Sequence, residues 1–175
     1  IDGKYYMHFS GNEHLYAAVA DSPLGAFKQC GNGKPMIEER AIDSSLFFDK
    51  DGKKWIYFVR MNDGNNVWVA PLNDDYISFD LAKAKQEWER AQARVNEGPC
   101  VFRKGKKYYM IYSANDYQSP KYGLGLAIAK DPEGPWVKRD DNPFMQCVDT
   151  LVGVGHNSFF TDMDGKFSLE VASGA

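Results

Sequence analysis

Four stretches of the chain repeat one pattern of polar and apolar positions. Each starts with a polar turn that contains a glycine and continues as an apolar, aromatic-rich segment, a composition that favours β-strands. The turn glycines are Gly3, Gly52, Gly105 and Gly165, so successive repeats are 49, 53 and 60 residues apart. A further apolar segment precedes each of the last three turns, and another follows each of the first three. The pattern therefore predicts units of short strands joined by hairpin turns.

Units of about 50 residues with about four strands are typical of β-propeller blades. We therefore expect an all-β fold, with a single partial propeller domain over residues 1–175. A β-sandwich with coincidental repeats is the alternative architecture. The open ends of a partial propeller would expose strand edges, which favours self-association or pairing with a complementary fragment. The boundaries predicted from the repeats are an incomplete blade over 1–41, blades over 42–95 and 96–154, and an incomplete blade over 155–175.

Composition narrows the classes of partner. The net charge of −3 and the scattered Lys and Arg residues give no basic surface for nucleic acid. No apolar run reaches the length of a membrane span, and the sequence assigns no compartment. The three cysteines lack the spacing of a zinc site. One stretch, 81–92, contains strong helix formers, but its apolar positions are too sparse for an amphipathic helix.

The repeat also aligns three ionisable residues. Asp43 lies nine residues before its turn glycine, Glu97 eight before, and His156 nine before. All three stand at the start of the strand that leads into the hairpin, and this first strand of a blade runs along the propeller axis. The sequence therefore predicts that Asp43, Glu97 and His156 face one central pocket.

Two carboxylates and an imidazole in one pocket suit acid-assisted cleavage of an acetal, because a nearby like charge helps one acid keep its proton. The alternative is that these residues only cap strand ends or bind central waters. Two further positions are candidates for substrate binding. Phe47 follows Asp43 closely and is expected to line the pocket, whereas Asn115 stands in a loop after a strand and either contacts substrate or turns the chain.

At these residues the chain resembles glycoside hydrolase family 43, the five-bladed propeller enzymes that act on xylans and arabinans. The similar segments are IDSSLFFDKDGKKWIYF, VNEGPCVFRKGKKYYMIYSAND, YGLGLAIAKDPEGPWVK and VGVGHNS, which occur in this order at blade spacing. The resemblance implies about blades two to five of the propeller, with the first and last of these incomplete. It also implies hydrolysis of xylosidic or arabinosidic bonds with inversion.

The resemblance implies a role for each aligned residue. Glu97 matches the general acid, and Asp43 matches the aspartate that orients the acid and modulates its pKa. The general base of the family belongs to the first blade, for which this chain has no matching segment. His156 matches a histidine that often helps to hold a hydrated central calcium ion; since calcium takes six to eight oxygen ligands, water would supply most of them. No other cofactor is expected.

Several other functions remain compatible with these residues. The chain as it stands could be a non-catalytic carbohydrate-binding propeller that binds an oligosaccharide or pentoside without turnover. It could also be a half-protein that becomes active with a complementary fragment or a second copy. Sucrose-type propeller hydrolases are a neighbouring enzyme class, although the Gly-Pro after Glu97 fits them less well.

Overall fold

The computed structural model describes residues 1–62, 64–87 and 95–173, and these residues form an all-β arrangement of sheets. Neighbouring strands pair in antiparallel fashion within each sheet. The two helical elements of the described residues are short 3₁₀ turns, η1 (Gly31–Gly33) and η2 (Leu81–Lys83). No described helix is long and apolar enough to cross a bilayer. The prediction of an all-β chain is therefore confirmed.

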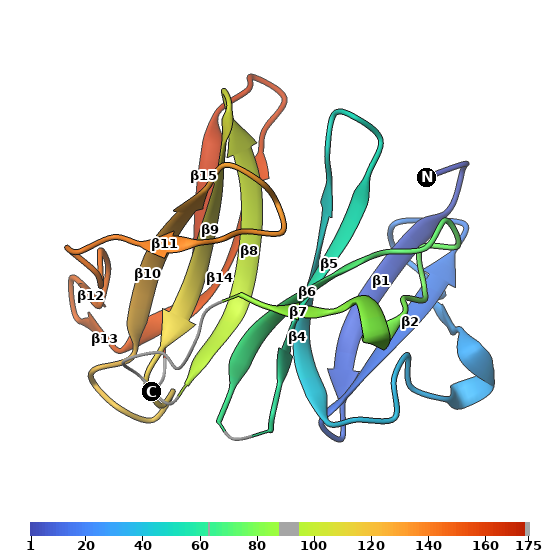
Figure 1. The fold of residues 1–175 in the computed structure, drawn as a ribbon, viewed down its shortest axis with the longest axis horizontal. Coiled ribbons are helices and arrows are strands. Elements are labelled where there is room, and N and C mark those ends of the chain that lie inside the picture. Colours follow the sequence, from blue (N-terminus) through green and yellow to red (C-terminus); the bar gives the residue numbers. More distant parts are fainter. Residues whose placement is uncertain (63, 88–94, 174–175) are drawn as a thin grey trace.

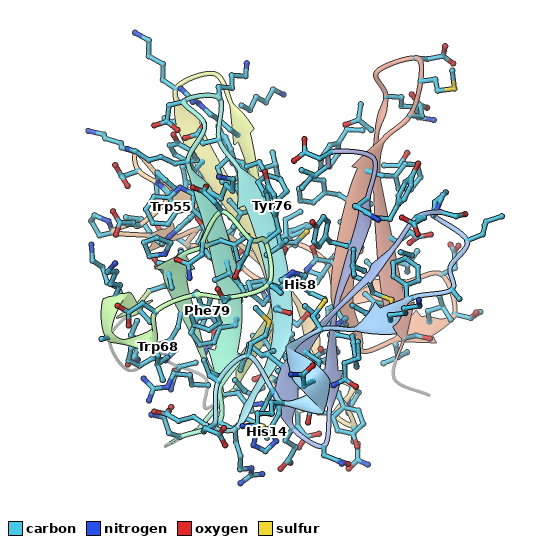
Figure 2. The ribbon with its side chains drawn as sticks, turned by 90° about the vertical axis from the view of Figure 1, so that its right-hand side faces the viewer. His8, His14, Trp55, Trp68, Tyr76 and Phe79 are labelled. Atoms are coloured by element: carbon cyan, nitrogen blue, oxygen red, sulfur yellow. The ribbon has the colours of Figure 1, made fainter. Side chains whose placement is uncertain are left out.

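The first sheet contains β1 (Tyr5–Gly11), β2 (His14–Ala20) and β3 (Lys28–Gln29), in that order. It packs against the second sheet through His8 of β1, whose Nε2 lies 2.8 Å from the Tyr76 carbonyl oxygen. Both side chains are labelled in Figure 2. Burial lowers the pKa of His8, which favours the neutral ring at this contact.

The second sheet contains β4 (Ala41–Phe48), β5 (Lys54–Arg60), β6 (Asn66–Pro71) and β7 (Lys85–Gln86) in sequence order. Figure 1 shows it between the first and third sheets. Since both faces are covered, the interior of β5 is continuously apolar rather than alternating, with five consecutive buried residues between Lys54 and Arg60. The core toward the first sheet consists of Leu15, Ile37, Ala41, Ile56, Phe58, Ala70, Leu72 and Phe79.

The third sheet contains β8 (Asn96–Lys104), β9 (Lys107–Ala114), β10 (Gly123–Ala129) and β11 (Val137–Lys138). It shares a second apolar core with the second sheet. This core is formed by Phe47, Trp55, Tyr57, Val59, Val67, Val69, Val101, Tyr108, Met110, Tyr112, Ala127, Ala129 and Trp136.

The fourth sheet consists of β14 (Val154–Thr161) and β15 (Phe167–Ser173) among the described residues. A separate small hairpin, β12 (Cys147–Val148) and β13 (Leu151–Val152), precedes it. The first strands of the last three sheets are neighbours: β4 contacts β8, and β8 contacts β14. This adjacency brings three segments, about 50 residues apart in sequence, to one place.

The stretch 81–92 contains the turn η2, after which Lys85 and Gln86 form β7 at the edge of the second sheet. Asp80 caps η2 by accepting a hydrogen bond from the Ala82 N–H at 3.0 Å. The last part of that stretch, 88–92, lies outside the described residues. The sparse apolar pattern therefore agrees with the absence of a long helix over 81–87.

Candidate active site

The strands β4, β8 and β14 each carry a bulge near their first residues. The pairing register shifts between Ile42 and Ser45 in β4, between Glu97 and Cys100 in β8, and around His156 in β14. Asp43 and His156 adopt left-handed backbones, with φ of 56° and 46°. Such a conformation costs a non-glycine residue about 1–2 kcal/mol. Bulges re-aim side chains and are frequent beside active sites, so three at one register indicate a functional centre.

The Asp43 carboxylate links all three strands. Its Oδ2 accepts a hydrogen bond from the Gly98 N–H at 3.1 Å and lies 4.0 Å from His156 Nδ1. The Asp43 N–H donates to Ser10 Oγ of β1 at 3.0 Å, which anchors the bulge to the first sheet. The side chain is only 13% exposed. Burial raises the pKa of Asp43, while His156 and the Gly98 N–H act in the opposite direction.

Glu97 is half-buried and held by two donors. The Tyr122 hydroxyl donates to Oε1 at 2.8 Å, and the Asn65 amide donates to Oε2 at 3.3 Å. Asn65 precedes β6 and Tyr122 precedes β10, so two sheets hold this carboxyl group. The backbone of the next residue, Gly98, is fixed by Asp43. Both the side chain and its strand are therefore positioned from outside β8.

His156 lies at the bulge of β14, a strand that contacts both β8 and β9. The His156 N–H donates to Ser113 Oγ of β9 at 2.7 Å. The next residue, Asn157, donates from its side chain to the Gly98 carbonyl oxygen at 3.0 Å. The fourth sheet thus holds the bulge of β8 through the Gly98 carbonyl group, as Asp43 of the second sheet holds it through the Gly98 N–H.

The two candidate substrate-binding residues lie elsewhere. Phe47 is 9% exposed and belongs to the core between the second and third sheets, where its ring is edge-on to Tyr108. Its position does not support the predicted contact with substrate. Asn115 is exposed at the end of β9, with φ of 75°, and its side chain donates to the Lys121 carbonyl oxygen at 2.7 Å. It closes the loop 115–121, and a contact with substrate stays a prediction.

The described residues do not fit a calcium site by themselves. They contain no group of three or more His, Cys, Asp or Glu side chains arranged to hold a metal ion. The carboxylate beside His156 is that of Asp43, whereas calcium takes six to eight oxygen ligands. No step of the chemistry proposed below depends on this ion.

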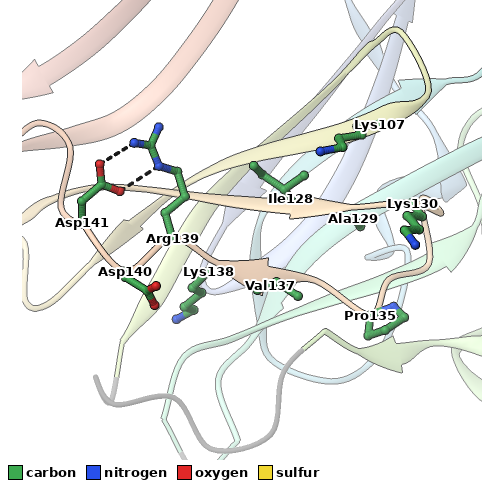
Figure 3. A pocket seen from close by; sticks show the side chains of 10 residues that line it. All are labelled: Lys107, Ile128, Ala129, Lys130, Pro135, Val137, Lys138, Arg139, Asp140 and Asp141. Atoms are coloured by element: carbon green, nitrogen blue, oxygen red, sulfur yellow. Dashed lines mark hydrogen bonds and ion pairs between the residues drawn. The ribbon is translucent and has the colours of Figure 1, made fainter.

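A hollow of about 770 Å³ lies on the third sheet, away from these residues (Figure 3). It is lined by Lys107, Ile128, Ala129, Lys130, Pro135, Val137, Lys138, Arg139, Asp140 and Asp141. Ile128 and Val137 continue the cross-strand row of Phe102 and Tyr109. Phe102 is covered by Phe159 and Phe167 of the fourth sheet. The hollow is therefore the uncovered part of a packing face rather than a second centre of chemistry.

Sequence reasoning missed three groups that complete the site: Tyr122, Ser113 and Asn65. Each is polar and sits in or beside the end of a strand, but nothing in its local sequence distinguishes it from an ordinary loop or strand residue. The only available signal was indirect, since Ser113 and Tyr122 flank the loop that contains Asn115. Their importance appears only when β8, β9 and β14 are side by side.

The fold and this site together define a β-propeller protein with paired carboxylates near its axis. The comparison with protein families agrees: the model of glycosyl hydrolases family 43 matches residues 1–172. The chain therefore belongs to glycoside hydrolase family 43.

Individual relatives show the same relationship. A β-xylosidase of Xylanibacter ruminicola is 33% identical, over 96% of this chain and 61% of that protein. The β-D-galactofuranosidase xynD of Aspergillus niger is 28% identical, over 93% of this chain and 48% of that protein. The chain thus spans about half the length of the curated relatives that it matches.

Solved structures support the fold. An endo-1,4-β-xylanase from Bacteroides thetaiotaomicron superimposes with a TM-score of 0.86 and 39% identity, covering 95% of this chain and 60% of that one. A thermostable family-43 glycoside hydrolase superimposes with a TM-score of 0.81 and 32% identity, covering 97% and 61%. The prediction of a partial five-bladed propeller is confirmed.

Proposed function

We propose that the chain provides the general acid of a glycosidase that cleaves xylosidic or arabinofuranosidic bonds with inversion. The observation that carries the proposal is the cluster at the three bulges, where Glu97 is held by two donors and Asp43 joins its strand to those on either side. Glu97 is the general acid. Asp43 fixes the backbone beside it through the Gly98 N–H.

The proposed reaction moves one proton from the Glu97 carboxyl group to the leaving glycosidic oxygen. The bond between that oxygen and the anomeric carbon breaks, and its electron pair stays with the oxygen. A water molecule attacks the opposite face of the sugar and gives its proton to a general base.

The general base of this proposal comes from outside the described residues. Among residues 1–62, 64–87 and 95–173, the carboxylates at the three bulges are Asp43 and Glu97, and both already have roles. An inverting enzyme places its acid and base about 6.5–9.5 Å apart to leave room for the water. A segment that supplies this carboxylate has to bring it to this distance from Glu97.

The substrate class is supported by the names of the relatives. They include β-xylosidases and α-L-arabinofuranosidases, and one relative is a β-D-galactofuranosidase. We propose a xyloside or an arabinofuranoside because these recur among the similar proteins.

The test is hydrolysis of nitrophenyl β-xyloside and α-L-arabinofuranoside by the chain, alone and with an added segment that carries the base. We expect turnover when the base is supplied, with inverted product seen by proton NMR. Glu97→Gln should lower kcat by at least about 100-fold, whereas Glu170→Gln, at an exposed glutamate, should not. Turnover that survives Glu97→Gln would contradict the acid assignment. Binding of xylo-oligosaccharides without turnover in either case would favour the non-catalytic carbohydrate-binding alternative.

Self-association is a second candidate property, favoured by the uncovered part of the third sheet. Val137 is 67% exposed there, although Phe102 at the other end of its row is packed under two aromatic rings. A second copy of the chain would cover this row. Sedimentation at increasing protein concentration tests it: a mass that stays monomeric at about 100 μM excludes a dimer of useful affinity.

A further inference from the structure

A continuous line of hydrogen bonds leads from the fourth sheet to Glu97. The His156 N–H donates to Ser113 Oγ at 2.7 Å, and Ser113 is hydrogen-bonded to the Tyr122 hydroxyl. The Tyr122 hydroxyl then donates to Glu97 Oε1 at 2.8 Å. Ser113 is fully buried and Tyr122 is 3% exposed. The line therefore runs through the interior, where such bonds are screened least.

The Tyr122 ring is held in place by the backbone of the fourth sheet. A Cβ atom at Gly155 would lie 2.0 Å from Tyr122 Cε1, so only glycine allows the ring to lie this close to the strand. The Tyr122 N–H also donates to the Ser119 carbonyl oxygen at 2.9 Å. The hydroxyl group consequently has little freedom to leave Glu97.

We infer that Tyr122, supported by Ser113 and Gly155, is a positioning residue that fixes the Glu97 carboxyl group and stabilises its carboxylate form. The inference rests on the proposed function of Glu97 as the general acid. It adds a role distinct from that of Asp43: Asp43 fixes the backbone beside Glu97, whereas Tyr122 holds the carboxyl group itself. The titratable groups that face this cluster are Asp43 from β4, His156 from β14 and Tyr122 itself.

The chemistry of the phenol suits this role. Burial raises the pKa of Tyr122 well above its ordinary value. The hydrogen bond with Ser113 acts in the opposite direction, whereas Glu97 and Asp43 raise the pKa further. The hydroxyl therefore keeps its proton and remains a donor. A donor strengthens its bond when the acceptor becomes charged, so the bond tightens as Glu97 gives its proton to the leaving oxygen. The proton on Tyr122 does not move in this step.

The test is a titration of the Glu97 carboxyl carbon by ¹³C NMR, with the signal assigned by its loss in Glu97→Gln. Tyr122→Phe keeps the ring and removes only the hydroxyl, and we expect the titration midpoint to rise by about one pH unit. Ser113→Ala, which removes the support behind Tyr122, should raise it by less. Tyr109→Phe is the matched control: it removes a hydroxyl from β9 four residues along the strand from Ser113 and should leave the midpoint unchanged.

A midpoint that is unchanged in folded Tyr122→Phe would overturn the inference, and so would an equal rise in Tyr109→Phe. If Tyr122→Phe does not fold, Ser113→Ala takes its place, and an unchanged midpoint in folded Ser113→Ala would overturn the inference. The titration needs no turnover, so its outcome is distinguishable from that of the activity assay. With the base supplied, Tyr122→Phe should also move the alkaline limb of the pH–rate profile upward and lower kcat about tenfold. A changed titration without any turnover would keep the positioning role and contradict the glycosidase proposal.

Discussion

The two faces of the third sheet differ in how they are covered. One face is sealed against the second sheet by a row of buried side chains that includes Met110, Tyr57 and Trp136. The other face is covered by the fourth sheet along β8, β9 and part of β10, and Phe102 stacks there on Tyr109 beneath two aromatic rings. Around Ile128 and Val137, which line the hollow, that face is open, and Val137 is 67% exposed.

This difference in cover explains the hollow in Figure 3. The same cross-strand row is covered at one end and bare at the other. A hollow of this origin reflects where a neighbouring sheet ends, not the convergence of reactive groups. The reactive groups converge instead at the bulges of β4, β8 and β14. The hollow is therefore a poor guide to the candidate active site.

Mutations on the face sealed against the second sheet should lower the free energy of unfolding most. Tyr57 is fully buried, and its hydroxyl donates to the Pro132 carbonyl oxygen at 2.6 Å. Tyr57→Ala should lower the free energy of unfolding by about 4 kcal/mol, because it leaves a cavity between two sheets. Urea denaturation measures this. Tyr57→Phe removes only the hydrogen bond and should cost about 1 kcal/mol; a loss below that for Tyr57→Ala would show that the face is not sealed.

A second test of the sealed face uses pH. Glu87 is 6% exposed, and neither carboxylate oxygen has a hydrogen-bond partner among the described residues. Burial raises its pKa to about 8 from an ordinary value of 4.5, and Glu133 adds to the effect. The folded chain therefore holds a proton that the unfolded chain releases, so stability falls as pH rises between these values.

The expected loss between about pH 5 and pH 8 is roughly 3 kcal/mol, below the ~5 kcal/mol of the full shift. Glu87→Gln, which cannot ionise, should flatten this dependence when unfolding is measured in urea at several pH values. Glu38→Gln, at an exposed glutamate, should leave it in place. An equal pH dependence in wild type and Glu87→Gln would mean that another group is responsible.

Mutations on the face toward the fourth sheet should lower the free energy of unfolding by less. Phe102→Ala removes a ring whose centroid lies 5.1 Å from that of Phe159 and 5.0 Å from that of Phe167. We expect a loss of about 2 kcal/mol, since the residue is only partly buried. Val137→Ala, in the same row but bare, should cost less than about 0.5 kcal/mol. If Val137→Ala instead lowers the free energy of unfolding by more than this, and the loss depends on protein concentration, a second copy covers this row in solution.

Part of the site was predictable because the repeat is regular. Equivalent residues of successive units occupy equivalent places, so the alignment of Asp43, Glu97 and His156 with their turn glycines was enough to place all three at one end of adjacent strands. The position of Phe47 was not predictable in this way. The bulge between Ile42 and Ser45 adds one residue to β4, and one extra residue turns every later side chain to the other face.

The sequence by itself determined that the chain forms repeated hairpins, because short apolar segments between glycine turns can bury their side chains in few ways other than as paired strands. It also determined which ionisable residues share a register. Only the tertiary structure decided what holds them. Tyr122, Ser113 and Asn65 reach this cluster from other strands and loops, and hydrogen bonds between such distant segments depend on the packing of whole sheets, which no local pattern records.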